Sequence, residues 1–149
     1  MSAWGCMSSN LRMVATALTL MLLALSAHAA EPLALQGVMK DLGKHMQTIA
    51  TVIAYEDWEQ VAATAPLIAE HPQPPFLEKA RIISFVGGNM SRFKALDAQT
   101  KDAALEMQQA AHEKNGVRVI AAFEKVQLSC LDCHQTFRKS FVEHFYGKK

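Results

Sequence analysis

The stretch Cys130-Leu131-Asp132-Cys133-His134 constrains this chain more than any other part of its sequence. On a helix, positions i, i+3 and i+4 share one face, so both thiols and the imidazole would point the same way. Two cysteines at this spacing, followed at once by histidine, are the pattern for covalent attachment of c-type haem. We therefore expect thioether bonds from Cys130 and Cys133, with His134 as the proximal ligand to iron.

Two other interpretations of the paired cysteines fit the sequence less well. A thioredoxin-like redox pair needs a preceding strand and a helix that opens at the first cysteine, and nothing here has the pattern of a strand. A zinc site normally takes four ligands, and no second Cys/His pair stands at finger spacing. The sequence therefore predicts one covalently bound haem c.

The first residues have the pattern of a secretory signal peptide. Arg12 precedes an uncharged apolar run over residues 13–25, and Ala27-His28-Ala29 places small residues at a cleavage site after Ala29. The apolar run is too short to span a bilayer comfortably. We expect residues 1–29 to be removed together with Cys6, leaving a periplasmic domain of residues 30–149 without a membrane span.

Charge and cysteine content exclude several classes of protein. Removing residues 1–29 takes away one of the 15 Lys and Arg residues and none of the 14 Asp and Glu residues, so the remaining charges balance. No basic stripe suggests nucleic acid. The only cysteines left are those of the motif, so no structural disulfide is expected.

Helical periodicity predicts four long helices. The first spans about residues 32–54, the second 58–71, the third 91–114, and the fourth begins near Val117 and carries the motif. We expect Pro66 to kink or break the second helix near Ala65. Residues 71–75 cannot continue a helix, and a short amphipathic helix over residues 76–86 should follow, with Ala80, Ile83 and Val86 on its inner side.

The apolar stripes of these helices predict the fold class and the position of the thiols. The stripe of the fourth helix consists of Val117, Ile120, Phe123, Val126, Cys130, Cys133, Phe137 and Phe141. Because the stripe passes through the motif, the thiols should project into the interior. Four striped helices with short connections predict an all-α antiparallel four-helix bundle with the haem on the last helix.

The opposite face of the iron needs a ligand or an apolar cover, and Met39 is the candidate ligand. It lies on the inward stripe near the start of the first helix, which runs antiparallel to the fourth. Met46 lies two turns later on the same stripe and is an alternative, as is core packing for either methionine. His45 could supply a second imidazole instead. We expect His71, His112 and His144 to be surface or capping residues.

Two stretches resemble the class II c-type cytochromes, which include cytochromes c′ and cytochrome c-556. Phe137-Arg138 follows His134 as in that group, and residues 38–46 are similar to the first helix of cytochrome c-556. The resemblance implies a four-helix bundle with Met39 as the distal iron ligand. A basic residue that cytochromes c′ often carry near Leu35 is missing. Residues 139–149 extend past the usual end, and we expect their aromatic residues to add core packing rather than a docking surface.

With both axial positions filled, no site remains for a substrate. We therefore expect one-electron transfer between periplasmic or membrane-bound redox proteins, and no enzymatic activity. If Met39 only packs over the iron, the alternative is a five-coordinate haem protein that binds NO or CO. A peroxidase would need a distal acid–base group, for which His45 is the only nearby candidate. The resemblance leaves a homodimer open.

Overall fold

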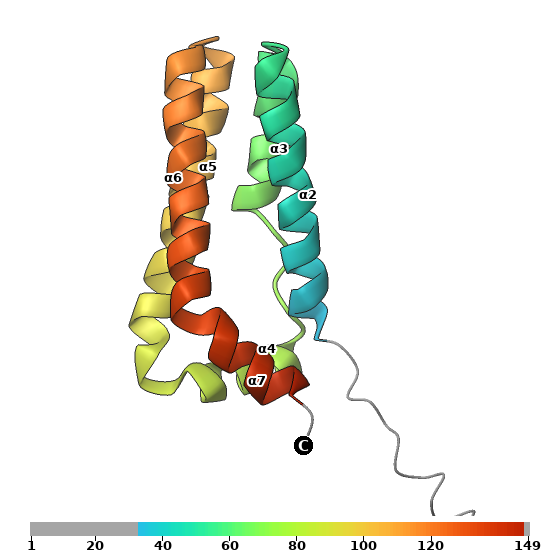
Figure 1. Cartoon of the computed structure of the whole chain (residues 1–149), viewed down its shortest axis with the longest axis vertical. Helices are drawn as coiled ribbons and strands as arrows, with labels where there is room; N and C mark the ends of the chain where they lie inside the picture. Colours follow the sequence, from blue (N-terminus) through green and yellow to red (C-terminus); the bar gives the residue numbers. More distant parts are fainter. Residues whose placement is uncertain (1–32, 148–149) are drawn as a thin grey trace, which may run out of the picture. The chain divides into compact units, whose positions relative to one another are not determined.

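The computed structural model describes residues 33–147. Four long helices, each antiparallel to the one before it, make up most of this range (Figure 1). They are α2 (Ala34–Ala54), α3 (Trp58–Ala69), α5 (Met90–His112) and α6 (Gly116–Cys133). Helix α5 packs against α6 and α3, and α3 packs against α2. The all-α antiparallel four-helix bundle is thus confirmed, whereas the predicted signal peptide, its cleavage site and Cys6 lie outside the described residues.

Two helices begin at side-chain caps that the sequence supplies locally. The Asp57 carboxylate accepts a hydrogen bond from the Gln60 N–H at 3.0 Å, and the Asn115 side chain accepts one from the Arg118 N–H at 3.1 Å. Each cap satisfies a backbone donor that has no partner within its own helix. These caps fix the starts of α3 and α6 at the same end of the bundle (Figure 1).

Of the kink or break predicted near Ala65, the break is wrong. Helix α3 continues through Pro66 to Ala69, and the Glu70 N–H donates to the Pro66 carbonyl at 2.8 Å. Proline removes one hydrogen bond, but Ala65 and Ile68 on either side of it are buried in the core, and their packing holds the helix together. Residues 71–75 then leave the helical conformation, as predicted.

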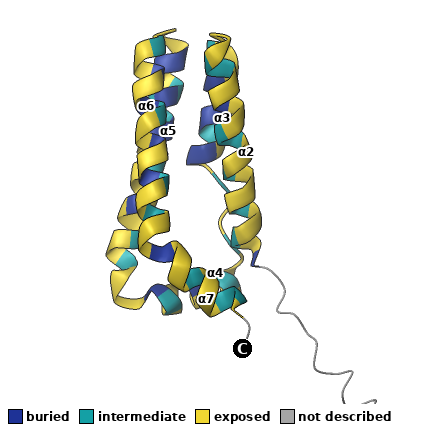
Figure 2. Cartoon of the chain, viewed as in Figure 1, coloured by how far each residue is buried: buried dark blue, intermediate teal, exposed yellow. Residues whose placement is uncertain are grey.

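Apolar side chains gather in two separate clusters. The main cluster joins all four long helices, and its largest fully buried members are Ile49, Val61, Ile68, Met107, Val119 and Val126. The second cluster contains Ile82, Val86, Leu96 and Phe137. Buried positions recur along α3, α5 and α6, on the sides that face the bundle (Figure 2).

Two predicted stripes are displaced from their observed positions. On α6, Val117 and Ile120 are exposed, and the buried face runs instead through Val119, Ala122 and Val126. On the short helix α4 (Phe76–Val86), Val86 is buried as predicted, but Ala80 and Ile83 are exposed and Ile82 takes the inner position.

The chain closes one end of the bundle with short helical pieces. A 3-10 turn, η2 (Gly87–Asn89), joins α4 to α5. After α6 comes a π-helical segment, η3 (His134–Arg138), and then α7 (Lys139–Tyr146), which turns away from α6 and lies beside α4 (Figure 1). The Phe85 ring lies 5.6 Å from that of Phe141 and 5.4 Å from that of Phe145. The predicted packing role of the C-terminal extension is therefore confirmed.

Within residues 33–147 no helix combines the length and the apolar character that a bilayer span requires.

Candidate functional site

The two cysteines of the motif lie where α6 passes from one apolar cluster to the other. Cys130 packs against the main cluster, and Cys133, one turn later, packs against the second. Both thiols are free and half-buried. Their predicted projection into the bundle is confirmed, and together they mark the boundary between the clusters.

His134 stands at a change of helix type. Its N–H is shared between the Cys130 and Leu131 carbonyls, and the five-residue π-helical segment η3 begins at this position. The Thr136 hydroxyl donates to the Asp132 carbonyl at 2.7 Å, which satisfies an acceptor where the backbone spacing changes. A π-helical turn changes the direction of the helix axis, so α7 runs in a different direction from α6.

Burial sets the protonation of the motif. It raises the pKa of the Cys130 thiol, and it raises the pKa of Cys133 with smaller contributions from Cys130 and Asp97. The pKa of His134 is lowered, first by burial and then by the positive charge of Arg138. These shifts favour the thiol forms of the cysteines and the neutral imidazole of His134, which is the form that binds iron.

Helix α2 meets the same boundary at Met39. Leu35 packs against the second cluster, whereas Leu42 and Met46 pack against the main cluster. Met39 lies between them, belongs to neither cluster and is 42% exposed. The two candidate methionines therefore differ in their surroundings, because Met46 packs against the main cluster and Met39 lies on α2 between residues of the two clusters.

Helix α5 changes clusters at Thr100. Leu96, one turn before it, is in the second cluster, and Ala103, nearly one turn after it, is in the main cluster. The Thr100 and Ser129 hydroxyls lie 2.8 Å apart, within hydrogen-bond distance. This polar pair ties α5 to α6 next to Cys130, at the edge of the boundary.

The short length of α3 shapes this level of the bundle. It ends at Ala69, in the main cluster, so that residues 71–75 replace a helix beside the boundary (Figure 1). Helices α2 and α6 are not among the pairs whose backbones approach most closely. The half-buried thiols of Cys130 and Cys133 and the adjacent His134 are the residues here that could hold a haem.

Other predicted residues are less engaged at the site. His45 is half-buried on α2, beside Met46, and Arg138 is exposed. His112 and His144 are exposed, as predicted. Among residues 33–147, no group of three or more His, Cys, Asp or Glu side chains could hold a bare metal ion.

His71 was wrongly predicted to be a surface residue. Its side chain is only 16% exposed, and Nε2 lies 3.2 Å from Oδ1 of Asp97. The hydrogen bond to Asp97 is the main cause that raises the pKa of His71, and the same bond lowers the pKa of Asp97. The two residues are 26 positions apart, and no sequence pattern links them.

The family model described as cytochrome c′ matches residues 84–138, from the end of α4 through η3. This match supports a class II c-type cytochrome of the c′ family. Members of its family bind haem c covalently, and the Cys130/Cys133 pair of this cytochrome fits their CxxCH motif, so its cofactor is haem c. Proteins of this family are generally haem carriers rather than enzymes. The comparisons with curated proteins and with solved structures gave no match for the cytochrome.

Proposed function

We propose that this cytochrome carries single electrons through a haem c attached to Cys130 and Cys133, with His134 and Met39 as the axial ligands of the iron. The main support for this proposal is the position of Met39 on α2. It is the one residue of the inward stripe of α2 from Leu35 to Ile49 that packs with neither cluster, and it lies at the boundary that the cysteines mark.

Partial exposure of an apolar side chain at this level supports a ligand role. A methionine placed for packing, like Met46, is held by neighbours from several helices. Met39 is partly exposed and not packed into either cluster, so its thioether would be free to bind iron from the side opposite His134. A thioether ligand favours the ferrous state relative to a second imidazole and so raises the reduction potential.

Electron transfer follows from filled axial positions. A haem held by Cys130, Cys133, His134 and Met39 would supply one-electron chemistry between a donor and an acceptor, without a bond to substrate. We propose that the donor and acceptor are periplasmic or membrane-bound redox proteins that bind in small, transient contacts. The proposed export through residues 1–29 would bring the chain to the compartment where haem is attached.

Spectra of the holoprotein beside two methionine variants test the ligand. Met39→Ala should abolish the sulfur-to-iron charge-transfer band, whereas the matched control Met46→Ala should keep it. Met46→Ala should instead lower the free energy of unfolding by about 2 kcal/mol, because it removes volume from the main cluster. A band that survives in Met39→Ala but disappears in Met46→Ala would transfer the ligand role to Met46.

The second candidate function is binding of NO or CO, and the match to the cytochrome c′ family is what favours it. In that case Met39 would cover a five-coordinate iron without binding it. Rapid CO binding to the reduced wild type, at the rate of Met39→Ala, would support the gas-binding protein. Slow binding in the wild type, accelerated in Met39→Ala, would support the electron carrier.

A further inference from the structure

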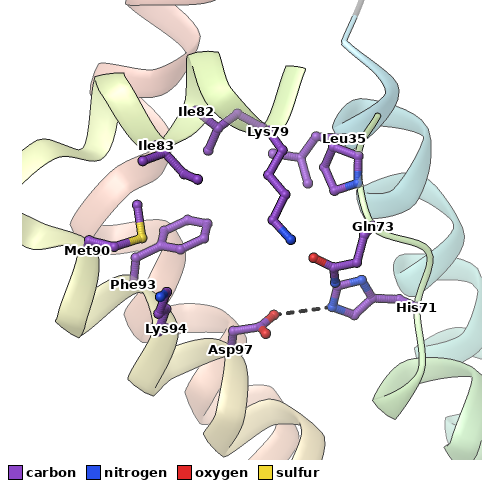
Figure 3. Close-up of a pocket in the computed structure, with 11 residues that line it drawn as sticks. Leu35, His71, Gln73, Lys79, Ile82, Ile83, Met90, Phe93, Lys94 and Asp97 are labelled. Atoms are coloured by element: carbon purple, nitrogen blue, oxygen red, sulfur yellow. Dashed lines mark hydrogen bonds and ion pairs between the residues drawn. The ribbon is translucent and has the colours of Figure 1, made fainter. Parts of the chain in front are cut away.

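A pocket of about 250 Å³ lies between the start of α2, residues 71–75, α4 and the first turns of α5 (Figure 3). One side of the pocket is apolar and includes Leu35, Ile82 and Phe93. The other side is polar and is formed by His71, Gln73, Lys79, Lys94 and Asp97. The pocket therefore suits a ligand that is apolar at one end and charged at the other.

The apolar side of the pocket is continuous with the haem site. Leu35 and Phe93 pack against the second cluster, which is also the cluster that Cys133 joins. Phe93 lies against Phe137 with 5.4 Å between ring centroids. Asp97, on the polar side, lies close enough to Cys133 to influence its thiol. A group attached at Cys133 would therefore lie beside the same cluster that Leu35 and Phe93 of the pocket contact.

The polar side carries an excess of positive charge. His71 and Asp97 are paired at 3.2 Å and neutralise each other when the imidazole is protonated. Lys79 and Lys94 have no carboxylate within 4 Å among residues 33–147. The Lys79 side chain extends along the pocket toward Gln73 (Figure 3). In the described part of the chain, Lys79 and Lys94 therefore have no ion-pair partner beside the apolar surface, and Asp97 is the one carboxylate that lines the pocket with them.

We propose that this pocket holds the two carboxylates of the haem, with Lys79 and Lys94 as their counter-ions. The proposal rests on haem attachment at Cys130 and Cys133, as proposed above. Haem c combines an apolar ring with two carboxylates, and the pocket offers an apolar wall with two unpaired cations. Charge-assisted hydrogen bonds to lysine keep a carboxylate ionised when it leaves bulk water. At the start of α2, Leu35 offers no charged group to a carboxylate. The positive charges come instead from Lys79 on α4 and Lys94 on α5.

The test measures the midpoint potential of the purified holoprotein as a function of pH. The variants are Lys79→Gln, Lys94→Gln and the double variant, and the matched control is Lys101→Gln, which removes a nearby charge of α5 that does not line the pocket. Loss of the counter-ions should raise the pKa of the haem carboxylates. We expect the pH at which the potential changes to rise by about 1 unit or more in the double variant. Above that pH, the midpoint potential of the double variant should lie below that of the wild type. Removing the two lysine charges takes away positive charge that disfavours the ferric state.

Other titrating groups face the pocket and need their own control. They are His71 from the connection between α3 and α4 and Asp97 from α5. Measurements in a His71→Gln background remove the imidazole titration and should leave the effect of the lysine substitutions in place. Arginine at position 79 or 94 keeps the charge and should restore the wild-type pH profile.

The outcomes separate this proposal from the one on which it rests. Covalent haem with lysine variants that match Lys101→Gln at every pH would overturn the carboxylate pocket and leave electron transfer untouched. Purified wild type without covalent haem would overturn the proposed function itself. A shift confined to the pocket lysines, and reversed by arginine, would establish both counter-ions.

Discussion

The carboxylate of Glu78 accepts a hydrogen bond from the backbone N–H of Leu35 at 2.8 Å, although the two residues lie 43 positions apart. Its second oxygen accepts from the Ala34 N–H at 2.7 Å. Helix α2 has no side-chain cap of its own, so a residue of α4 satisfies its first donors. A negative charge at this end of the helix is also favourable to its dipole.

Met39 lies one turn after Leu35 on α2, so loss of the Glu78 hydrogen bonds should weaken the bond between Met39 and the iron. Glu78→Ala should lower the free energy of unfolding by about 1 kcal/mol, as the loss of a helix cap does. It should also weaken the sulfur-to-iron band on warming, at temperatures well below unfolding. Glu124→Ala on the exposed side of α6 is the control and should change neither quantity. A band as heat-resistant as that of the wild type would show that Glu78 acts on stability alone.

Two glycines should respond to alanine with opposite signs. A Cβ at Gly116 would lie 2.9 Å from Cη2 of Trp58, whereas nothing lies within 4 Å of a Cβ at Gly43. Gly43→Ala should stabilise α2 by about 0.5–1 kcal/mol, because alanine loses less backbone entropy. Gly116→Ala should destabilise by about 1–3 kcal/mol through overpacking against the indole. Chemical denaturation measures both, and equal signs would show that Trp58 moves aside freely.

The helix bounds could be predicted from the sequence because they depend on local signals. Asp57 and Asn115 cap the helices that follow them, and Gly87 has a positive φ of 54° where α4 ends. The cysteine motif is equally local, since one helical turn brings its residues to one face. These features needed no knowledge of which helices pack together.

The first turns of the buried face of α6 were not predicted, because small residues help to form it. Ala122 and Ser129 are buried against α5, which approaches α6 closely, while the larger Val117 and Ile120 are left outside. Periodicity favours large apolar residues and therefore placed Val117 and Ile120 on the inner side, whereas the later part of the predicted stripe, from Val126 through the two cysteines, does face the clusters. The polar side of the pocket was not predicted from the sequence for another reason. His71 and Asp97 meet only through the packing of distant elements.

The aromatic contact between α4 and α7 should contribute measurably to stability. Phe85 packs edge-to-face with Phe141 and Phe145, whereas Phe76 on the same helix is 83% exposed. Phe85→Leu keeps an apolar side chain but loses these contacts, so we expect a loss of about 1 kcal/mol in the free energy of unfolding. The matched control Phe76→Leu should stay within about 0.5 kcal/mol of the wild type. Equal values for the two variants would contradict a packing role for α7.

The His71–Asp97 pair should stabilise the fold only in a limited range of pH. The raised pKa of His71 gives a contribution that is complete below the ordinary value of 6.5 and is lost as pH rises through the higher folded-state pKa. The lowered pKa of Asp97 gives one that is complete above 3.8 and is lost as pH falls through the lower folded-state pKa. Both contributions are therefore complete between pH 3.8 and 6.5. Asp97 is 55% exposed, so solvent screening limits the coupling to about 1 kcal/mol.

A double-mutant cycle with His71→Gln and Asp97→Asn tests this dependence on pH. The coupling free energy between the two residues should be present in mildly acidic solution and lost in alkaline solution. Coupling that stays constant into alkaline solution would mean that a neutral hydrogen bond, rather than an ion pair, holds residues 71–75 against α5.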